Sequence, residues 1–369
     1  MNYNEFMDYV KEYVADYLPE KFVNAEVMIN QTVKNNDVEL DGLTILNPDS
    51  NMSPNIYLNT YYEEYQQGRE MEDIVADIAD RYIEHIEPRE EYAMKLSVSD
   101  FSNYDKIKDY IYPRVCNLES NRKRLADIPH TVKEDLAITY HVKVNSDKEA
   151  VGSFAIHNGL LKVYGVDLET LHHQAMNNME TLSPPTFQSL TEVMIEIMAP
   201  DFAMRERIPI EEAKELMRDA VPQGGPSVYC LSNESKLNGA AYIINEDIQK
   251  MVSEKIGGDY YVLPSSVHEV LVVPKSEDMS IEELENMVQS VNVSCVSADE
   301  ILSDHIYQYD AKTHTFSRCD KKQEMKYEYG QEQTNDRELA PLFAVTENKD
   351  SYDMDTPKQM HEPMKHKSH

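Results

Sequence analysis

The chain has 369 residues and a mass of 42.6 kDa, enough for two ordinary domains. Apolar residues make up 41% and charged residues 28%, as in soluble globular proteins, which argues against wholesale disorder. With 35 Lys and Arg against 67 Asp and Glu, the formal net charge is −32. Because phosphate backbones and anionic membranes repel such a chain, we expect neither direct nucleic-acid binding nor membrane binding.

The cysteines and the first residues favour a cytoplasmic protein. The opening MNYNEFMDYVKEYV is acidic and amphipathic, unlike a secretory signal, and no apolar run approaches the roughly 18 residues of a membrane span. Cys116, Cys230, Cys295 and Cys319 lie far apart, and no CxxC pair occurs. That spacing indicates free thiols in a reducing cytosol rather than a disulfide framework or a thiolate metal site.

Hydrophobic periodicity predicts a small N-terminal αβ unit over residues 1–95. Phe6, Val10, Val14 and Leu18 recur every four residues and predict an amphipathic helix that ends before Pro19. The elements predicted next are a β-hairpin over 26–46 with its turn at KNND (34–37), a short strand and a helix within 53–68, and a helix over 71–86.

A larger mixed α/β-sheet domain is predicted over residues 96–320, which makes the fold class α+β. Helices are predicted over 104–112 before Pro113, 166–179, 210–221, 246–256 after an Asn245 cap, from 281 after a Ser280–Glu283 capping box, and over 301–306 after a Ser297–Glu300 box. Strands are predicted over 136–144, 151–166, 227–232, 239–244, 260–264, 267–274 and 291–296. Residues 321–369 read as a mostly disordered polar tail, in which APLFAV (340–345) is a candidate docking segment.

The densest polar set lies within residues 229–269. If 267–273 is a strand, Ser266 and His268 share one face but lie about 7 Å apart, so spacing alone does not pair them. One hypothesis is a serine nucleophile, Ser265 or Ser266, with His268 as its base. The other is a strand entry whose serines satisfy open backbone groups, with His268 as a partly buried, hydrogen-bonded side chain. The candidate catalytic residues are Ser265, Ser266, His268, Glu269, Asn233 and Asn238.

Other polar motifs lack a complete site pattern. His173 and Asn177 share a helix face, next to His172 and Asn178, but no HExxH zinc pattern occurs. The basic island Arg122-Lys123-Arg124 reads as an exposed loop. No GxGxxG or GxxxxGK[ST] phosphate loop is present, and we expect no cofactor and no metal. A flexible tail holds no fixed geometry, which argues against a metal site formed by His361, His366 and His369.

Charge and tyrosine content bear on the choice between an enzyme and a binding protein. The acidic residues spread over the parts that look folded, so they form either a solvated surface or a surface that imitates a nucleic-acid backbone. The 24 tyrosines occur without a single tryptophan. Tyrosine is common at protein contact surfaces, so this composition supports a binding role.

Several separate strings resemble one uncharacterised bacterial family, domain-of-unknown-function family 5688, over about residues 1–310. These strings are VKNNDVELDGLTI (33–45), MSPNIYLNTYYEEYQQG (52–68), SFAIHNGLLKVYGV (153–166), VYCLSNESKLNGAA (228–241) and YYVLPSSVHEVLVVP (260–274). The part from about 130 to 310 also looks like a second uncharacterised family. The resemblance implies a bacterial origin, often near mobile-element genes, and a cytoplasmic product. It carries over no activity and no catalytic residues.

Three functional hypotheses follow. The first is a non-enzymatic protein that contacts another protein, with a basic protein as the expected partner, as a mobile-element accessory factor or a nucleic-acid-mimic decoy. The second is a hydrolase or transferase that uses the Ser/His/Asn cluster in 229–269. The third is a small-molecule-binding module with its ligand between the two units.

Overall fold

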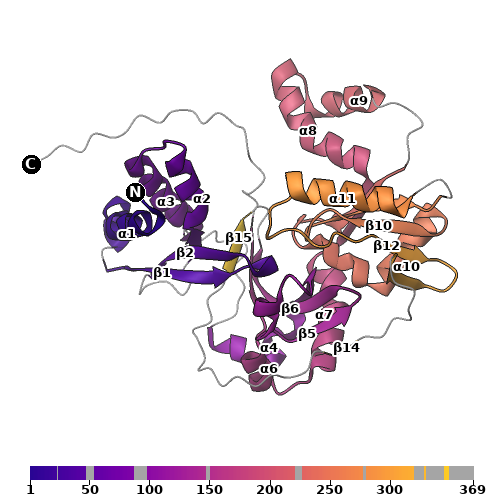
Figure 1. Cartoon of the computed structure of the whole chain (residues 1–369), viewed down its shortest axis with the longest axis horizontal. Helices are drawn as coiled ribbons and strands as arrows, with labels where there is room; N and C mark the ends of the chain where they lie inside the picture. Colours follow the sequence, from indigo (N-terminus) through magenta and orange to yellow (C-terminus); the bar gives the residue numbers. More distant parts are fainter. Residues whose placement is uncertain are drawn as a thin grey trace, which may run out of the picture.

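The computed structural model describes residues 1–22, 24–46, 54–86, 98–146, 150–220, 227–276 and 280–319, together with 328–329 and 345–348. Within these residues, three antiparallel β-sheets are surrounded by helices (Figure 1). The predicted α+β class, with a small N-terminal unit beside a larger part, is confirmed. The boundaries predicted at 95 and 320, and the tail prediction apart from two short strands, lie outside the described residues.

The N-terminal unit forms as its periodicity predicts. Its elements are α1 (Tyr3–Tyr13), η1 (Val14–Tyr17), η2 (Glu20–Phe22), β1 (Glu26–Val33), η3 (Asn35–Asp37), β2 (Glu39–Leu46), β3 (Asn55–Tyr57), α2 (Leu58–Gln66) and α3 (Met71–Ile86). Asn2 and Glu5 form a capping box at the start of α1. The helices bury one face on the three-stranded sheet, where Phe6, Leu43 and Ile74 are fully buried in a separate hydrophobic cluster.

The second sheet is built around β6, which pairs with β4 along one edge and with β5 and β7 along the other. Its strands are β4 (Ile111–Asn117), β5 (His130–Lys133), β6 (Leu136–Ser146), β7 (Ala150–Ala155), β14 (Glu328–Tyr329) and β15 (Val345–Asn348). The helical segments near it are η4 (Val98–Ser102), α4 (Tyr104–Ile107), η5 (Lys108–Tyr110), α5 (Arg122–Leu125), α6 (Asn158–Tyr164) and α7 (Leu168–Leu182).

Two predictions for this region are wrong in part. Pro113 does not end a helix but lies inside β4, which among the described strands pairs only with β6, and an edge strand tolerates the missing N–H. The strand predicted over 151–166 ends at Ala155, and α6 follows it. Gly165 ends α6 in the left-handed conformation that favours glycine (φ 67°).

The third sheet runs in the order β13-β12-β10-β11-β9-β8. Its strands are β8 (Pro185–Ser189), β9 (Tyr229–Asn233), β10 (Tyr260–Pro264), β11 (Val270–Pro274), β12 (Tyr307–Asp310) and β13 (Thr315–Arg318). The helices between them are α8 (Leu190–Glu206), α9 (Ile210–Ala220), η6 (Gly239–Ile244), α10 (Glu246–Ile256) and α11 (Ile281–Cys295). The predicted Asn245 and Ser280 caps are confirmed, and Gly257 ends α10.

Four predicted elements differ from the structure. Residues 239–244 form the 3₁₀ helix η6 rather than a strand, and 291–296 complete and follow α11. Residues 301–306 form no regular helix, and 267–269 belong to a loop that precedes β11. Short apolar runs do not distinguish a strand from a buried helical segment, which explains the error at η6.

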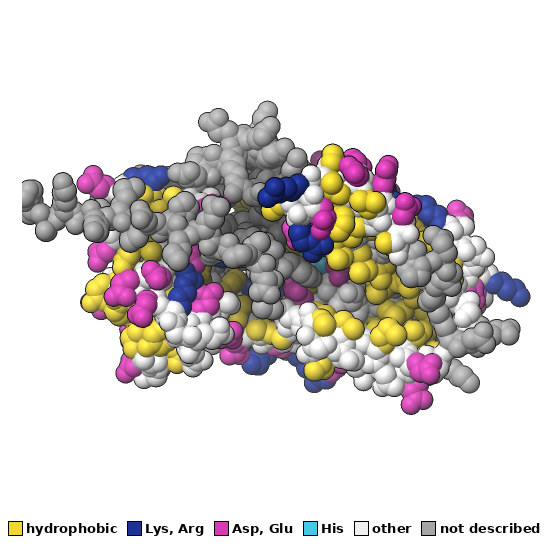
Figure 2. Space-filling model, turned by 90° about the horizontal axis from the view of Figure 1, so that it is seen from above, with side chains coloured by type: hydrophobic (Ala, Val, Ile, Leu, Met, Phe, Trp, Pro, Cys, Tyr) yellow, Lys and Arg dark blue, Asp and Glu magenta, His cyan; other side chains and the backbone are white. Residues whose placement is uncertain are grey.

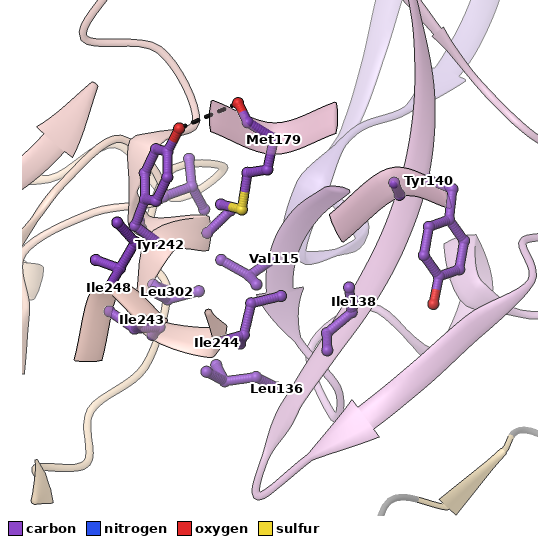
Figure 3. Packing of buried hydrophobic residues seen from close by; sticks show 14 of the residues in the cluster. Val115, Leu136, Ile138, Tyr140, Met179, Tyr242, Ile243, Ile244, Ile248 and Leu302 are labelled. Atoms are coloured by element: carbon purple, nitrogen blue, oxygen red, sulfur yellow. Dashed lines mark hydrogen bonds between the residues drawn. The ribbon is translucent and has the colours of Figure 1, made fainter. Parts of the chain in front are cut away.

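The main core lies between the second and third sheets, with η6 at its centre (Figure 3). Ile244 of η6 points toward Leu136 of β6, and Ile243 lies beside Leu302. Tyr242 donates to the carbonyl oxygen of Met179 in α7. All six residues of η6 are buried. A continuous apolar run suits this position because every side of η6 faces protein.

The tip of the β1–β2 hairpin, η3, joins the N-terminal unit to the larger part. Asn36 Nδ2 donates to the carbonyl oxygens of Ala298 (2.8 Å) and Ile301 (2.7 Å), and Asn35 Nδ2 donates to that of Asp299 (2.7 Å). Asn36 adopts the left-handed conformation (φ 58°), which asparagine tolerates well. The KNND turn therefore connects β1 to β2 and also binds the N-terminal unit to residues 298–301 of the larger part.

Candidate functional site

The predicted polar set gathers around the loop between β10 and β11. This hairpin loop covers residues 265–269, because Pro264 and Val270 are paired across the two strands. The Ser266 N–H donates to the Glu269 carbonyl, and Ser266 Oγ accepts from the His268 N–H at 3.0 Å. The loop thus satisfies its own backbone through Ser266, as the structural interpretation of this motif predicts.

His268 is held at both ring nitrogens. Nδ1 accepts a hydrogen bond from the backbone N–H of Asn238 (3.1 Å), which leaves Nε2 to carry the proton and donate to Glu300 Oε1 (3.2 Å). The side chains of His268 and Glu300 are 11% and 15% exposed. The imidazole lone pair therefore meets a backbone amide, and His268 in this state is not free to take a proton from a hydroxyl.

The two serines do not pair with His268 through its ring. No serine hydroxyl in the described part of the chain bonds to either ring nitrogen. Ser265 Oγ donates to Glu269 Oε1 (3.2 Å), and Ser266 is only 1% exposed. The structure brings the predicted residues into one region, but not into the nucleophile–base order that catalysis at Ser265 or Ser266 requires. The catalytic assignment stays a prediction.

The segment between β9 and η6 lies against the 265–269 loop and contains Asn233, Asn238 and Gly239. Asn233 closes the turn after β9, since its Oδ1 accepts from Leu237 N–H and its Nδ2 donates to the Leu237 carbonyl. Asn238 is left-handed (φ 55°) and so aims its N–H at His268. A Cβ on Gly239 would lie 2.4 Å from Ser232 Oγ and 2.7 Å from the His268 carbonyl oxygen. Only glycine fits there.

The sequence did not predict the role of Glu300. Its carboxylate bonds His268, and its carbonyl oxygen accepts from the Val267 N–H at 2.8 Å. Glu300 directly follows the 298–299 carbonyls that hold the hairpin tip η3. The loop at 265–269 is thus connected to the N-terminal unit through 298–301, a link across more than 200 residues that no local spacing reveals.

The remaining predicted motifs have structural partners. His172 Nδ1 bonds Tyr140 Oη (3.0 Å), and burial lowers its pKa, whereas exposed His173 lies 3.8 Å from Glu169. Asn178 donates to two backbone carbonyls. The described residues include no group of three His, Cys, Asp or Glu side chains arranged to hold a metal ion. The tail histidines lie outside the described residues.

The basic island forms the short helix α5 rather than a loop. The amides of its second and third residues, Lys123 and Arg124, donate to the Asp37 carboxylate of the hairpin tip at 2.8 and 3.0 Å. Asn121, at the N-cap position, makes no side-chain cap of its own. Asp37 therefore caps this helix from another unit of the protein. Arg122 pairs with Glu119, and Lys123 pairs with Glu39 (2.8 Å).

A different feature has the character of a binding surface. Helices α8 and α9 project from the body as an antiparallel hairpin (Figure 1). Ile195, Ala199 and Ala203 face inward, whereas the opposite side of α8 exposes four large apolar side chains. This α8 face consists of Met194 (52% exposed), Ile197 (63%), Met198 (51%) and Met204 (78%). Their spacing puts all four on one side of the helix.

Acidic residues outnumber basic residues on the α8–α9 hairpin. Residues 190–220 contain eight acids and four bases. Asp201 lies in the middle of the α8 face, four residues after Ile197 and three before Met204, is exposed, and makes no ion pair with the described residues. Figure 2 shows hydrophobic side chains gathered over the α8, α9 and α11 part of the molecule, with both acidic and basic side chains around them. Neighbouring helices expose Leu216, Met287 and Val291.

Comparison with known proteins gives one match. A family model described as a family of unknown function, DUF5688, matches residues 3–311. The chain belongs to this family. The DUF5688 match runs from α1 through β12 and includes the α8–α9 hairpin and the 265–269 loop, whereas β13, β14 and β15 lie beyond it. No curated protein and no solved structure matches the chain.

The helices also bear on the membrane question. Of those in the described part of the chain, none is both long enough and apolar enough to cross a membrane.

Proposed function

We propose that this protein acts by binding another protein through the α8 face, and that the partner carries positive charge. The observation that carries the proposal is the exposure of four large apolar side chains on one side of one helix. Single exposed apolar residues are ordinary, but an apolar stripe on a projecting helix is typical of a contact surface.

Charge selects among the possible occupants of the α8 face. A contact between two copies would bring together two hairpins that each carry eight acids and four bases, on chains that each carry a net charge of −32. Like charges at such a contact disfavour a second copy. A basic protein fits better, because its cations can neutralise Asp201 and the excess negative charge of the hairpin while its apolar groups cover the methionines.

The experiment is quantitative capture from bacterial lysate with three forms of the tagged protein. The wild type is compared with Ile197→Asp/Met198→Asp, and with the control Tyr13→Asp/Tyr17→Asp, which places the same charges on exposed aromatic residues of the N-terminal unit. We expect a defined basic protein with the wild type and the control, and at least a tenfold loss with the α8 variant. Equal capture by both variants would contradict the proposal.

Salt separates this function from the decoy hypothesis. Binding to a nucleic-acid-mimic surface weakens steeply as salt rises, because charge supplies most of its affinity. Apolar burial on the α8 face weakens little with salt. We therefore expect the captured protein to remain bound in 0.5 M salt, roughly five times the ionic strength at which the Debye length is about 10 Å. Complete release below that point would favour the decoy.

The hydrolase hypothesis receives no comparable support, because both ring nitrogens of His268 are engaged.

A further inference from the structure

We infer that the segment recognised by the α8 face is a basic amphipathic helix of the partner. This inference rests on the proposed function and names the class of ligand. Its starting point is the shape of the exposed stripe, which runs lengthwise along α8 from Met194 to Met204, with Pro200 inside the helix between them. At 1.5 Å per residue the stripe is about 15 Å long, the length of three turns of a partner helix.

The residue types in the stripe favour a helical ligand. Three of its four apolar members are methionines, whose unbranched thioether side chains adapt to ridges of different shape. An amphipathic helix presents large apolar residues three and four positions apart, and these can interdigitate with side chains at the same spacing on α8. An extended strand would instead need free backbone groups to pair with, and those of α8 are bonded within the helix.

The charges decide which amphipathic helix fits. Asp201 interrupts the apolar stripe with an exposed carboxylate that makes no ion pair with the described residues. Covering it with an apolar side chain would bury an unpaired charge, which is costly, whereas a Lys or Arg of the ligand would neutralise it. Glu196 and Glu206 lie about 140° round the helix from Asp201, and Glu206 pairs with Arg205 (3.2 Å), so Asp201 is the carboxylate of the stripe that favours a cationic ligand.

The test uses three synthetic 18-residue peptides and fluorescence anisotropy. The first has leucines on one helical face and lysines on the other. The second replaces every lysine by glutamate, and the third has the composition of the first in strict alternation, which suits a strand and not a helix. We expect the wild-type protein to bind the first peptide at least tenfold more tightly than either of the others.

Substitutions in the protein separate apolar docking from simple charge attraction. Met198→Asp adds a negative charge, so attraction of charge alone would strengthen binding of the lysine peptide. We expect at least tenfold weaker binding, because the substitution removes apolar contact. Tyr13→Asp, with the same added charge on α1, should leave the affinity unchanged within twofold. Met198 is half exposed, so folding of the variant is expected to persist, and its unfolding midpoint checks this.

The outcomes distinguish the inference from the proposed function. Unchanged or tighter binding by Met198→Asp, or equal binding of the alternating peptide, would overturn the inference. If the lysine helix fails to bind while lysate capture still depends on Ile197 and Met198, the proposed function stands and the partner uses another structure. If capture does not depend on these residues either, both fall.

Discussion

His268 lies where three distant parts of the chain meet. Its ring links the amide of Asn238, at the start of η6, to the carboxylate of Glu300, while its carbonyl oxygen accepts from Ser232 Oγ at 2.8 Å. Every one of these groups is buried or nearly so. A buried polar network of this kind stabilises one arrangement of the chain, because any other arrangement leaves donors or acceptors without partners.

Removing the ring should therefore cost stability. We expect His268→Ala to lower the free energy of unfolding by about 2–4 kcal/mol, since the Asn238 amide and the Glu300 carboxylate lose a buried partner. His157→Ala is the matched control, because the His157 side chain is half exposed and, among the described residues, bonds to Asp127 alone (3.1 Å). It should change stability by about 0.5 kcal/mol or less. Urea unfolding of both variants checks this, and equal losses would contradict it.

Lys133 gives a prediction of pH dependence. Burial lowers its pKa to about 8 from the usual 10.5. Between these two pH values the unfolded chain holds the proton and the folded chain releases it, so this lysine makes the folded state gain stability as the pH rises from about 8 to 10.5. Below about pH 8, both states are charged and the folded state bears the full cost of burial.

We expect Lys133→Met to be more stable than the wild type at pH 7 by about 1–3 kcal/mol. This advantage should shrink toward zero at pH 10, because the wild-type lysine is then neutral in the folded state. Urea unfolding of both proteins at the two pH values measures the difference. A constant difference, or a less stable variant at pH 7, would show that the ammonium is well compensated, for example by the Phe316 ring 5.5 Å away.

At the scale of elements, the β1–β2 hairpin has two roles. Its strands pair over eight residues and form the N-terminal sheet, while its turn reaches across to cap α5 and to hold residues 298–301. Asp37 contributes two charge-assisted bonds to this contact, and both are to backbone amides of α5.

Asp37→Ala should lower the free energy of unfolding by about 1–3 kcal/mol and speed amide hydrogen exchange in α5 and in residues 298–301. Asp310→Ala is the control, because Asp310 also accepts from two backbone amides, those of Lys312 and Thr313, but within one local turn. That variant should leave exchange at α5 unchanged. If Asp37→Ala also leaves it unchanged, the tip does not hold this helix in solution.

The sequence predicts elements best where hydrophobic periodicity is clean. The helices α1, α3, α9 and α10 follow from apolar residues three and four apart, and α10 also from its Asn245 cap. Hydrophobic periodicity did not predict helix α8, because its apolar residues lie on both its buried and its exposed sides and so do not alternate with a polar face. The same distribution makes α8 a candidate for binding. The periodicity fails there because some of the apolar residues do not face the protein's own core.

The candidate site was predictable only in part. The strings around Ser266 and Asn238 identify a dense polar region, and the structure does bring them together. The partner that fixes the His268 ring, Glu300, lies 32 residues further along the chain and was assigned to a helix cap instead. Long-range pairing of this kind depends on how the sheets stack, which local spacing does not contain.

At the scale of the whole molecule, the net charge of −32 opposes compaction through self-repulsion. Added salt screens this repulsion, so we expect the melting temperature to rise by about 2–6 °C between roughly 0.02 M and 0.3 M salt. Sodium and potassium chloride should act equally, because screening depends on ionic strength and not on a bound ion. Thermal unfolding followed by circular dichroism measures this, and a fall with salt would show that internal ion pairs outweigh the repulsion.

The contact of Asn36 with the carbonyls of Ala298 and Ile301 also has a consequence for the order in which the parts of the chain fold. The ribosome makes the N-terminal hairpin first, but the residues that its tip grips are made more than 250 positions later. The hairpin can pair its strands early, since those contacts are local. The polar groups of its tip remain hydrogen-bonded to water until residues 298–301, near the end of the region matched by the family model, have left the ribosome. Docking of the tip is therefore a late event in folding, and it joins the N-terminal hairpin to residues 298–301.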